Sequence, residues 1–273
     1  MITSTSNKKA AEVRNLGKKA SLRRELSLFT VEGIRMFAEI PEQRVRSVFV
    51  TERFLEGCPD EIREKIRRLP CELVTEEVFS SMSDTKTPQG VLAVAEQEKH
   101  TLADVLLGER TCLLVLETIQ DPGNLGTMLR AGEGAGLTGI VADAGTADIY
   151  NPKVIRSTMG SIFRVPVVYV QDLRKTILEL KRQKVQICAA HLRGSVDYDR
   201  ADYTGASAFL IGNEAKGLTD GTAALADRAV KIPMLGKVES LNAAVAASVL
   251  MYELARQRRN YTGFTSRISD IRV

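Results

Sequence analysis

The chain has 273 residues, of which 44% are hydrophobic and 26% are charged. These fractions exclude a disordered chain, and the length leaves room for two domains of ordinary size. No stretch approaches the ~18 uninterrupted apolar residues of a membrane span, and a secretory signal is absent from the amino-terminal segment. We therefore expect a soluble, cytoplasmic protein. The cysteines are too widely spaced for a zinc knuckle or a disulfide framework, since they stand at Cys58, Cys71, Cys112 and Cys188.

Positive charge is concentrated at both ends of a chain whose net charge is +4. Residues 1–25 carry seven Lys and Arg against two Glu, and residues 256–273 carry five Arg against one Asp. Such ends are typical of arms that hold a nucleic-acid backbone, and equally of solvated termini. Both interpretations stay open here, and we expect residues 1 to about 20 to be disordered without RNA. The absence of Trp argues against a sheet that stacks several exposed bases.

The first part of the chain predicts a small α/β domain. Helices are expected at Ile34–Ile40 and Asp60–Arg68, and strands at Ser27–Glu32, Val45–Thr51 and Gln89–Ala95. A polar stretch at residues 96–100 then leads to a second series of elements. We place the domain boundary between residues 104 and 105.

The second part predicts a parallel sheet covered on both faces, because near-continuous apolar strands alternate with helices. The expected strands are Cys112–Leu116, Gly139–Ala142, Val165–Val170, Val185–Ala190, Ala208–Ile211 and Val230–Pro233. The expected helices are Leu125–Gly134, Leu173–Gln183 and Leu241–Arg259. Ligands bind beyond the carboxyl ends of such strands, so function is sought in three strand-to-helix loops.

The first of these loops runs from Glu117 to Arg130. Asp121 is placed to cap a helix, with Pro122 at its first position. Asn124 and Arg130 are six residues apart and share a broad helix side. Taken alone, Arg130 reads as an ordinary surface residue.

The second loop follows an apolar strand, and the third precedes a helix rich in small residues. Gly212 and Gly217 allow a tight turn and close approach to a ligand, and Glu214 offers a carboxylate between them. Taken alone, this loop is an ordinary turn with a solvated Glu. In the third loop, Ser240 is placed as a helix cap. The small residues after Asn242 allow another helix to pack closely, which suggests a subunit interface.

Spacing argues against several other chemistries. Gly132 and Gly134 end a helical stretch, with Leu137 where a dinucleotide fingerprint needs glycine. Leu218 replaces the Lys of a phosphate loop. With two histidines in the chain, no Ser-His-Asp hydrolase is indicated, and no carboxylate or histidine cluster suggests a metal. We expect an organic cofactor instead.

Together and in this order, the three loops resemble the motifs of the SpoU, or TrmH-like, branch of the SPOUT RNA methyltransferases. The matching pieces are Asp121-Pro-Gly-Asn-Leu-Gly126 with Arg130, Gly212-Asn-Glu-Ala-Lys-Gly217, and Ile232-Pro-Met234 through Ser240-Leu-Asn242. The resemblance covers residues 108–260. The amino-terminal part, with Phe29–Arg35 and Thr87–Gly90, looks like the ribosomal-protein-like substrate-binding domain often joined to this enzyme.

The resemblance implies transfer of a methyl group from S-adenosylmethionine to a ribose 2′-hydroxyl of RNA. It implies an α/β fold with two parts: residues 1–104 as a basic arm and small RNA-binding domain, and residues 105–273 as a methyltransferase domain with a trefoil knot and a basic tail. A homodimer is implied as well. Large-subunit ribosomal RNA is the preferred substrate because of the extra domain, and transfer RNA is the nearer alternative.

Site roles follow from the same resemblance. Backbone groups of Gly212, Ile232 and Leu241 match the cofactor site. Arg130 is expected to hold a phosphate or stabilise the developing oxyanion, and Glu214 to accept the proton of the hydroxyl. Hydrogen bonds that orient the ribose are assigned to Asn124, Ser240 and Asn242, and lesser phosphate contacts to Lys216 and Arg156. A non-catalytic knotted RNA-binding module and a base-methylating enzyme remain alternatives.

Overall fold

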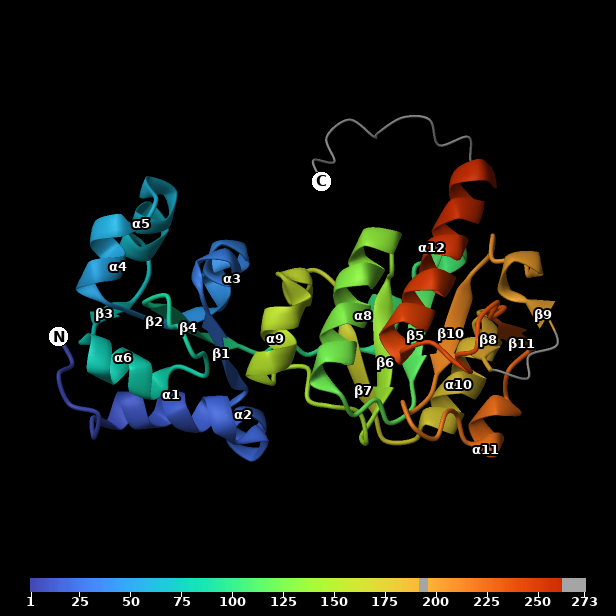
Figure 1. Ribbon diagram of the computed structural model, residues 1–273, viewed down its shortest axis with the longest axis horizontal. Coiled ribbons are helices and arrows are strands. Elements are labelled where there is room, and N and C mark those ends of the chain that lie inside the picture. The colour runs from blue at the N-terminus through green and yellow to red at the C-terminus, as the bar shows by residue number, and fades with distance from the viewer. Residues whose placement is uncertain (192–195, 262–273) are drawn as a thin grey trace. The chain divides into compact units, whose positions relative to one another are not determined.

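The computed structural model describes residues 1–191 and 196–261, with side chains through residue 259 (Figure 1). The chain forms two compact units. The first contains Met1–Lys99 and Asp148–Arg164, and the second contains His100–Ala147 and the described residues from Val165 onward. The basic tail residues Arg267 and Arg272 lie outside the described residues. Within those limits, no helix is both long and apolar enough to cross a membrane.

The first unit is built on a four-stranded sheet in the order β1-β4-β2-β3. Strands β1 and β2 run antiparallel to β4, and β3 is parallel to β2. The strands are β1 (Leu28–Glu32), β2 (Val45–Val50), β3 (Cys71–Leu73) and β4 (Val91–Glu96). The helices are α1 (Lys8–Lys18), α2 (Ala20–Leu26), α3 (Ile34–Glu39), α4 (Glu52–Gly57), α5 (Asp60–Arg67), α6 (Glu76–Met82) and α9 (Pro152–Thr158).

The prediction of a disordered amino terminus is wrong. Asn7 caps α1 by accepting a hydrogen bond from the amide of Lys9. Ala10, Val13 and Leu16 are spaced three apart, lie on one side of the helix and are buried in the core of this unit. The prediction rested on the basic residues of this segment and overlooked the apolar stripe between them.

Part of the amino-terminal charge is used inside the fold. Arg23 is only 2% exposed, and its guanidinium donates to Asp148 Oδ2 at 2.7 and 2.9 Å. It also donates to the carbonyls of Leu16 and Gly17. Lys9 pairs with Glu72. Arg23 therefore serves the fold from a buried position, while Lys9 and Arg24 remain exposed.

The segment Asp148–Arg164 lies in the sequence between two strands of the second unit but packs within the first. Helix α9 contacts β1, and the ring of Tyr150 lies 4.6 Å from that of Phe29, centroid to centroid. The predicted boundary between residues 104 and 105 falls close to the change of unit after Lys99. No pattern in the sequence predicted that Asp148–Arg164 would pack within the first unit.

The second unit is a seven-stranded parallel sheet in the order β7-β6-β5-β10-β8-β11-β9, which confirms the predicted fold class. Its strands are β5 (Cys112–Leu116), β6 (Gly139–Asp143), β7 (Val167–Val170), β8 (Gln186–Ala190), β9 (Val196–Asp197), β10 (Ser207–Ile211) and β11 (Arg228–Lys231). Its helices are α7 (Leu102–Val105), α8 (Pro122–Ala135), α10 (Leu173–Arg182), α11 (Asp220–Ala223) and α12 (Ala243–Tyr261).

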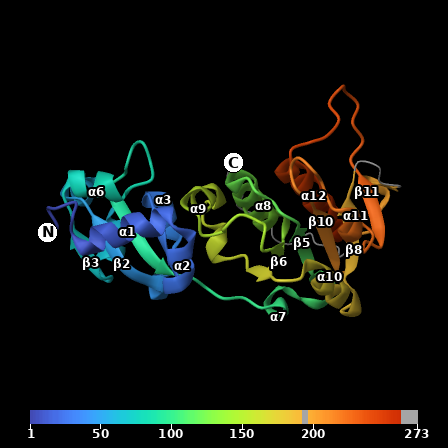
Figure 2. The same cartoon turned by 90° about the horizontal axis from the view of Figure 1, so that it is seen from below.

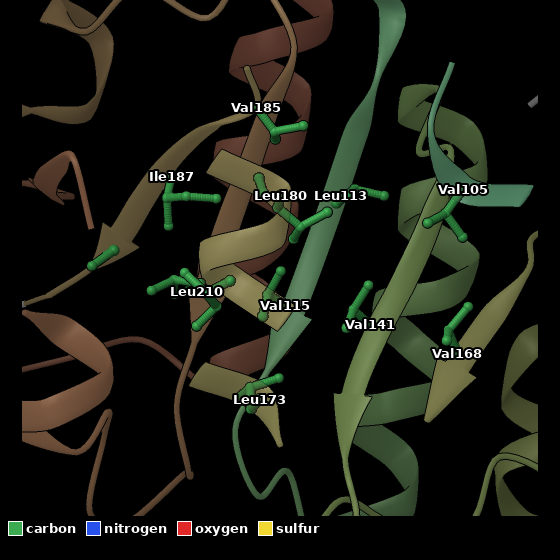
Figure 3. Packing of buried hydrophobic residues seen from close by; sticks show 13 residues of the cluster. Val105, Leu113, Val115, Val141, Val168, Leu173, Leu180, Val185, Ile187 and Leu210 are labelled. Carbon is green, nitrogen blue, oxygen red and sulfur yellow. The ribbon is translucent and has the colours of Figure 1, made fainter. Parts of the chain in front are cut away.

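Helices cover both faces of this sheet, with α8 and α12 on one face and α7 and α10 on the other (Figure 2). Side chains alternate between the faces along each strand, so Leu113 and Val115 of β5 point to the same side. There they join Leu173 and Leu180 of α10 in one buried cluster (Figure 3). The central strands β5 and β10 are buried at every position, as expected of a sheet covered on both sides.

Candidate active site

The three predicted loops meet at one edge of the second sheet. Strands β5 and β10 are parallel neighbours, and β11 follows on the other side of β8, also parallel, so the carboxyl ends of all three lie at the same edge. The amide of Glu117, just after β5, donates to the carbonyl of Ile211 at the end of β10 at 2.9 Å. The loops that follow these strands therefore begin side by side.

A pocket of about 430 Å³ opens at this edge. Its lining includes all three predicted cofactor residues, Gly212, Ile232 and Leu241. The volume lies in the range of ligand and cofactor pockets. Ala246 and Leu250 of α12 form part of the wall, and Lys216 and the unpredicted His191 also line it.

Gly212 permits the tight turn that bounds this pocket. Asn213 and Gly217 exchange two backbone hydrogen bonds of 3.1 and 2.8 Å, and Gly217 has a φ of +70°. A Cβ on Gly212 would lie 2.2 Å from both the carbonyl carbon of Gly217 and the nitrogen of Leu218. Because a side chain does not fit there, the backbone itself forms the wall, which suits a cofactor held largely by backbone groups.

A second hollow of about 500 Å³ adjoins the first. Four of the predicted catalytic residues line it: Asn124, Glu214, Ser240 and Asn242. Glu214, Ser240 and Leu241 line both hollows. A molecule in the first hollow and a molecule in the second would therefore be adjacent.

A chain of hydrogen bonds joins one side chain from each of the three loops. Asn242 Nδ2 donates to Asn124 Oδ1 at 2.8 Å, and Asn124 Nδ2 donates to Glu214 Oε1 at 3.0 Å. Asn242 Oδ1 accepts from the amides of Ala244 and Val245. These two hydrogen bonds orient the Asn242 side-chain amide, so its Nδ2 faces Asn124. The hydrogen bonds therefore run in one direction, from Asn242 through Asn124 to Glu214.

Glu214 is held by three donors. Besides Asn124, the amides of Asp121 and Gln120 donate to its carboxylate at 3.1 and 3.2 Å. Partial burial raises the pKa of Glu214, but these hydrogen bonds outweigh burial, so its pKa lies below the ordinary value. A carboxylate with a lowered pKa stays ionised at neutral pH and is a weak base. The hydrogen bond from Asn124 lets Glu214 orient that side chain, and its role as the proton acceptor stays a prediction.

Helix caps fix the positions of two loop residues. Asp121 Oδ1 accepts from the amide of Asn124 at 2.8 Å at the start of α8, as predicted. The predicted cap at Ser240 is wrong, because α12 begins at Ala243 and Asn242 caps it. Ser240 lies at the border of the two hollows instead.

Arg130 is not brought to this cluster within one chain. It is exposed on α8 and lines neither hollow. Among the described residues, it has no hydrogen-bond or ion-pair partner. Arg156 lies in the first unit, where it forms an ion pair with Asp84 at 3.1 Å, so its charge is already matched.

Asn213 was not predicted as a site residue, although it lies between Gly212 and Glu214. Asn213 Nδ2 donates to the carbonyl of Thr118 at 2.8 Å and ties the second loop to the first. Its place inside the motif was the available signal. For Thr118 itself, no pattern in the sequence indicated a role.

Known proteins resemble this chain over both units. The profile of the SpoU rRNA Methylase family matches residues 111–252, and that of the MRM3-like substrate binding domain matches residues 7–93. The Bacillus subtilis (strain 168) 23S rRNA (guanosine(2553)-2′-O)-methyltransferase RlmP is 32% identical over 254 residues, which is 93% of this chain and 98% of RlmP. The Xylella fastidiosa (strain 9a5c) 23S rRNA (guanosine-2′-O-)-methyltransferase RlmB is 35% identical over 206 residues, covering 72% of this chain and 83% of RlmB.

Solved structures agree with these sequence relatives. The SpoU methyltransferase AviRb from Streptomyces viridochromogenes, in complex with the cofactor AdoMet, matches with a TM-score of 0.84 and 27% identity over 92% of this chain and 98% of AviRb. The AdoMet-bound rRNA methyltransferase from Sinorhizobium meliloti matches with a TM-score of 0.80 and 29% identity over 96% and 97% of the two chains. The chain therefore belongs to the SpoU rRNA methylase family and is an S-adenosylmethionine-dependent RNA 2′-O-methyltransferase.

Proposed function

We propose that the protein methylates the ribose 2′-hydroxyl of a guanosine in large-subunit ribosomal RNA, in the cytoplasm. The observation that carries the choice of RNA is the match of residues 7–93 to a substrate-binding domain, together with relatives of nearly full length that are named for 23S rRNA. Two solved structures named for tRNA modification match 59% and 55% of this chain, with TM-scores of 0.51 and 0.50.

The proposal assigns RNA binding to residues 1–104 and methyl transfer to residues 105–273. Gly212, Ile232 and Leu241 would hold S-adenosylmethionine, which supplies an already activated methyl group. The chain itself has to align the ribose oxygen and manage its proton. Asn124, Ser240 and Asn242 line the hollow next to the cofactor residues and would orient the ribose there. The trefoil knot stays a prediction for this chain.

Methyl transfer from labelled S-adenosylmethionine to separate pools of large-subunit rRNA, small-subunit rRNA and tRNA tests this choice. Label is expected in the large-subunit rRNA alone. Label in tRNA alone would contradict the proposed substrate. Binding of RNA and cofactor without transfer to any pool would instead support the non-catalytic module.

Asn242→Asp separates the two roles of Asn242. The remaining carboxylate oxygen still caps α12, so we expect the melting temperature to change little. The second oxygen replaces the donor that faces Asn124 Oδ1, so two acceptors face each other there and the hydrogen-bond chain is broken. We expect the turnover rate to fall about tenfold or more, equivalent to ~1.4 kcal/mol. A fully active Asn242→Asp variant would show that the hydrogen bond from Asn242 to Asn124 has no catalytic role. Asn242→Ala is the control, because it loses the helix cap as well.

We also propose a homodimer formed through α12. Val245 and Tyr252, which are 47% and 49% exposed, and the half-buried Val249 are spaced four and three residues apart and form an apolar stripe on the outside of this helix. Helix α12 packs on α8, which carries Arg130. A second copy bound on this side would bring a cationic Arg130 toward the hollow that lacks it.

A hybrid dimer tests this arrangement. One protomer carries Arg130→Ala and the other carries Asn242→Ala, with different tags for purification. If Arg130 acts in the partner's site, one of the two sites is complete, and about half of the wild-type activity returns. An inactive hybrid would mean that Arg130 acts within its own chain. A monomer in solution would overturn the dimer itself.

A further inference from the structure

Thr118 adopts an unusual backbone conformation just after β5. Its φ is +57°, in the left-handed region that a β-branched residue rarely occupies. Thr118 lies three residues before Asp121, the cap of α8. A conformation of this kind persists only when its surroundings hold it in place.

Asp143, at the end of β6, accepts two of the hydrogen bonds that keep Thr118 in this conformation. Its Oδ1 accepts from the Thr118 amide at 2.9 Å, and its Oδ2 accepts from the Thr118 hydroxyl at 2.8 Å. The Thr146 hydroxyl donates to the same carboxylate at 2.8 Å. Asn213 binds the remaining polar group of Thr118, its carbonyl. Every polar group of Thr118 is therefore engaged.

The loop held in this way presents two amides to the active site. Gln120 and Asp121, two and three residues after Thr118, donate their backbone N–H groups to Glu214. Glu214 in turn accepts from Asn124, which lines the second hollow. Asp143 lines neither hollow, so any effect it has on the reaction passes through this loop.

We infer that Asp143 and Thr118 are positioning residues for methyl transfer: their hydrogen bonds hold the loop so that its amides fix Glu214 and, through it, Asn124. For its effect on rate, this inference rests on the proposed function. For its effect on the loop, it rests on the geometry alone. A carboxylate and a hydroxyl that merely stabilised the strand ends would change the stability of the protein and leave the rate of the folded enzyme unchanged.

The test compares Asp143→Ala and Thr118→Val with Thr118→Ser in the full-length protein. Asp143→Ala removes the acceptor, Thr118→Val removes the hydroxyl at nearly constant shape, and Thr118→Ser keeps the hydroxyl. Thr176→Val is the matched control, since the Thr176 hydroxyl donates to the carbonyl of Asp172, the residue that caps α10, far from this loop in the sequence. Turnover rate, KM for RNA, cofactor affinity and amide hydrogen exchange at residues 117–124 are measured for each folded variant.

We expect the amides of Gln120 and Asp121 to exchange about tenfold faster in Asp143→Ala and Thr118→Val, as befits the loss of one or two hydrogen bonds. Turnover should fall about tenfold or more, while KM and cofactor affinity change less than about threefold. Thr118→Ser and Thr176→Val should behave like the wild type. Lower thermal stability with unchanged turnover and unchanged exchange would overturn the inference.

The exchange measurement also separates this inference from the proposed function. If the wild type methylates no RNA, the proposed function fails, but protection of Gln120 and Asp121 still reports whether Asp143 holds the loop. If the wild type is active and Asp143→Ala leaves exchange at these two amides unchanged, the positioning role fails and the proposed function stands.

Discussion

Gly212→Ala is expected to weaken S-adenosylmethionine binding at least about a hundredfold, or ~2.7 kcal/mol. The added Cβ would lie 2.2 Å from backbone atoms of Gly217 and Leu218, so the loop that bounds the cofactor pocket has to move. Moving these backbone atoms costs free energy, because two hydrogen bonds between Asn213 and Gly217 hold them. Calorimetric titration with the cofactor, on protein shown to be folded by circular dichroism, measures the loss.

Gly236→Ala is the matched control for this change. Gly236 lies in the loop between β11 and α12, and an added Cβ there meets no atom within 4 Å. Its cofactor affinity should equal that of the wild type. Equal affinity of Gly212→Ala and wild type would place the cofactor somewhere other than the pocket beside Gly212.

Arg23→Ala is expected to destabilise the protein by about 3 kcal/mol, near the lower end for breaking a buried ion pair because Asp148 is partly exposed. The substitution removes the donor that Arg23 supplies to Asp148 Oδ2 and to the carbonyls of Leu16 and Gly17. It also removes the ion pair that links the segment Asp148–Arg164 to α2. Urea denaturation followed by circular dichroism gives the change in unfolding free energy.

The neighbouring Arg24→Ala isolates the effect of burial from that of charge. Arg24 is exposed, so its loss should change stability by no more than about 0.5 kcal/mol. Similar stabilities of Arg23→Ala and Arg24→Ala would mean that the buried guanidinium contributes nothing net to the fold.

Long apolar runs made most strands predictable. The strand at Cys112–Leu116 is found with the predicted bounds, and the strand expected at Ser27–Glu32 is found from Leu28. The strand expected at Val230–Pro233 is found two residues earlier, at Arg228–Lys231, because its register with β8 pairs Arg228 with Cys188. Pairing with a neighbouring strand decides such bounds, and that pairing is a tertiary contact.

The candidate site was predictable to the extent that it lies in short motifs. Three loops chosen from the sequence lie together in space, and most of the residues chosen in them line two adjoining hollows. Their roles remain predictions. What the sequence did not show depends on contacts between distant residues. Asp143, at the end of β6, bonds Thr118, which follows the neighbouring strand β5. The exposed position of Arg130 depends on how α8 packs.

Mass spectrometry of the methylated product tests the central claim most directly. Large-subunit rRNA transcribed in vitro is incubated with the protein and S-adenosylmethionine that carries a deuterated methyl group. The RNA is then digested to nucleosides, and each labelled nucleoside is fragmented into base and ribose. The account predicts one label per RNA, found on the ribose of a guanosine and absent when Asn242→Ala replaces the wild type. Label on a base, or on no nucleoside at all, would contradict it.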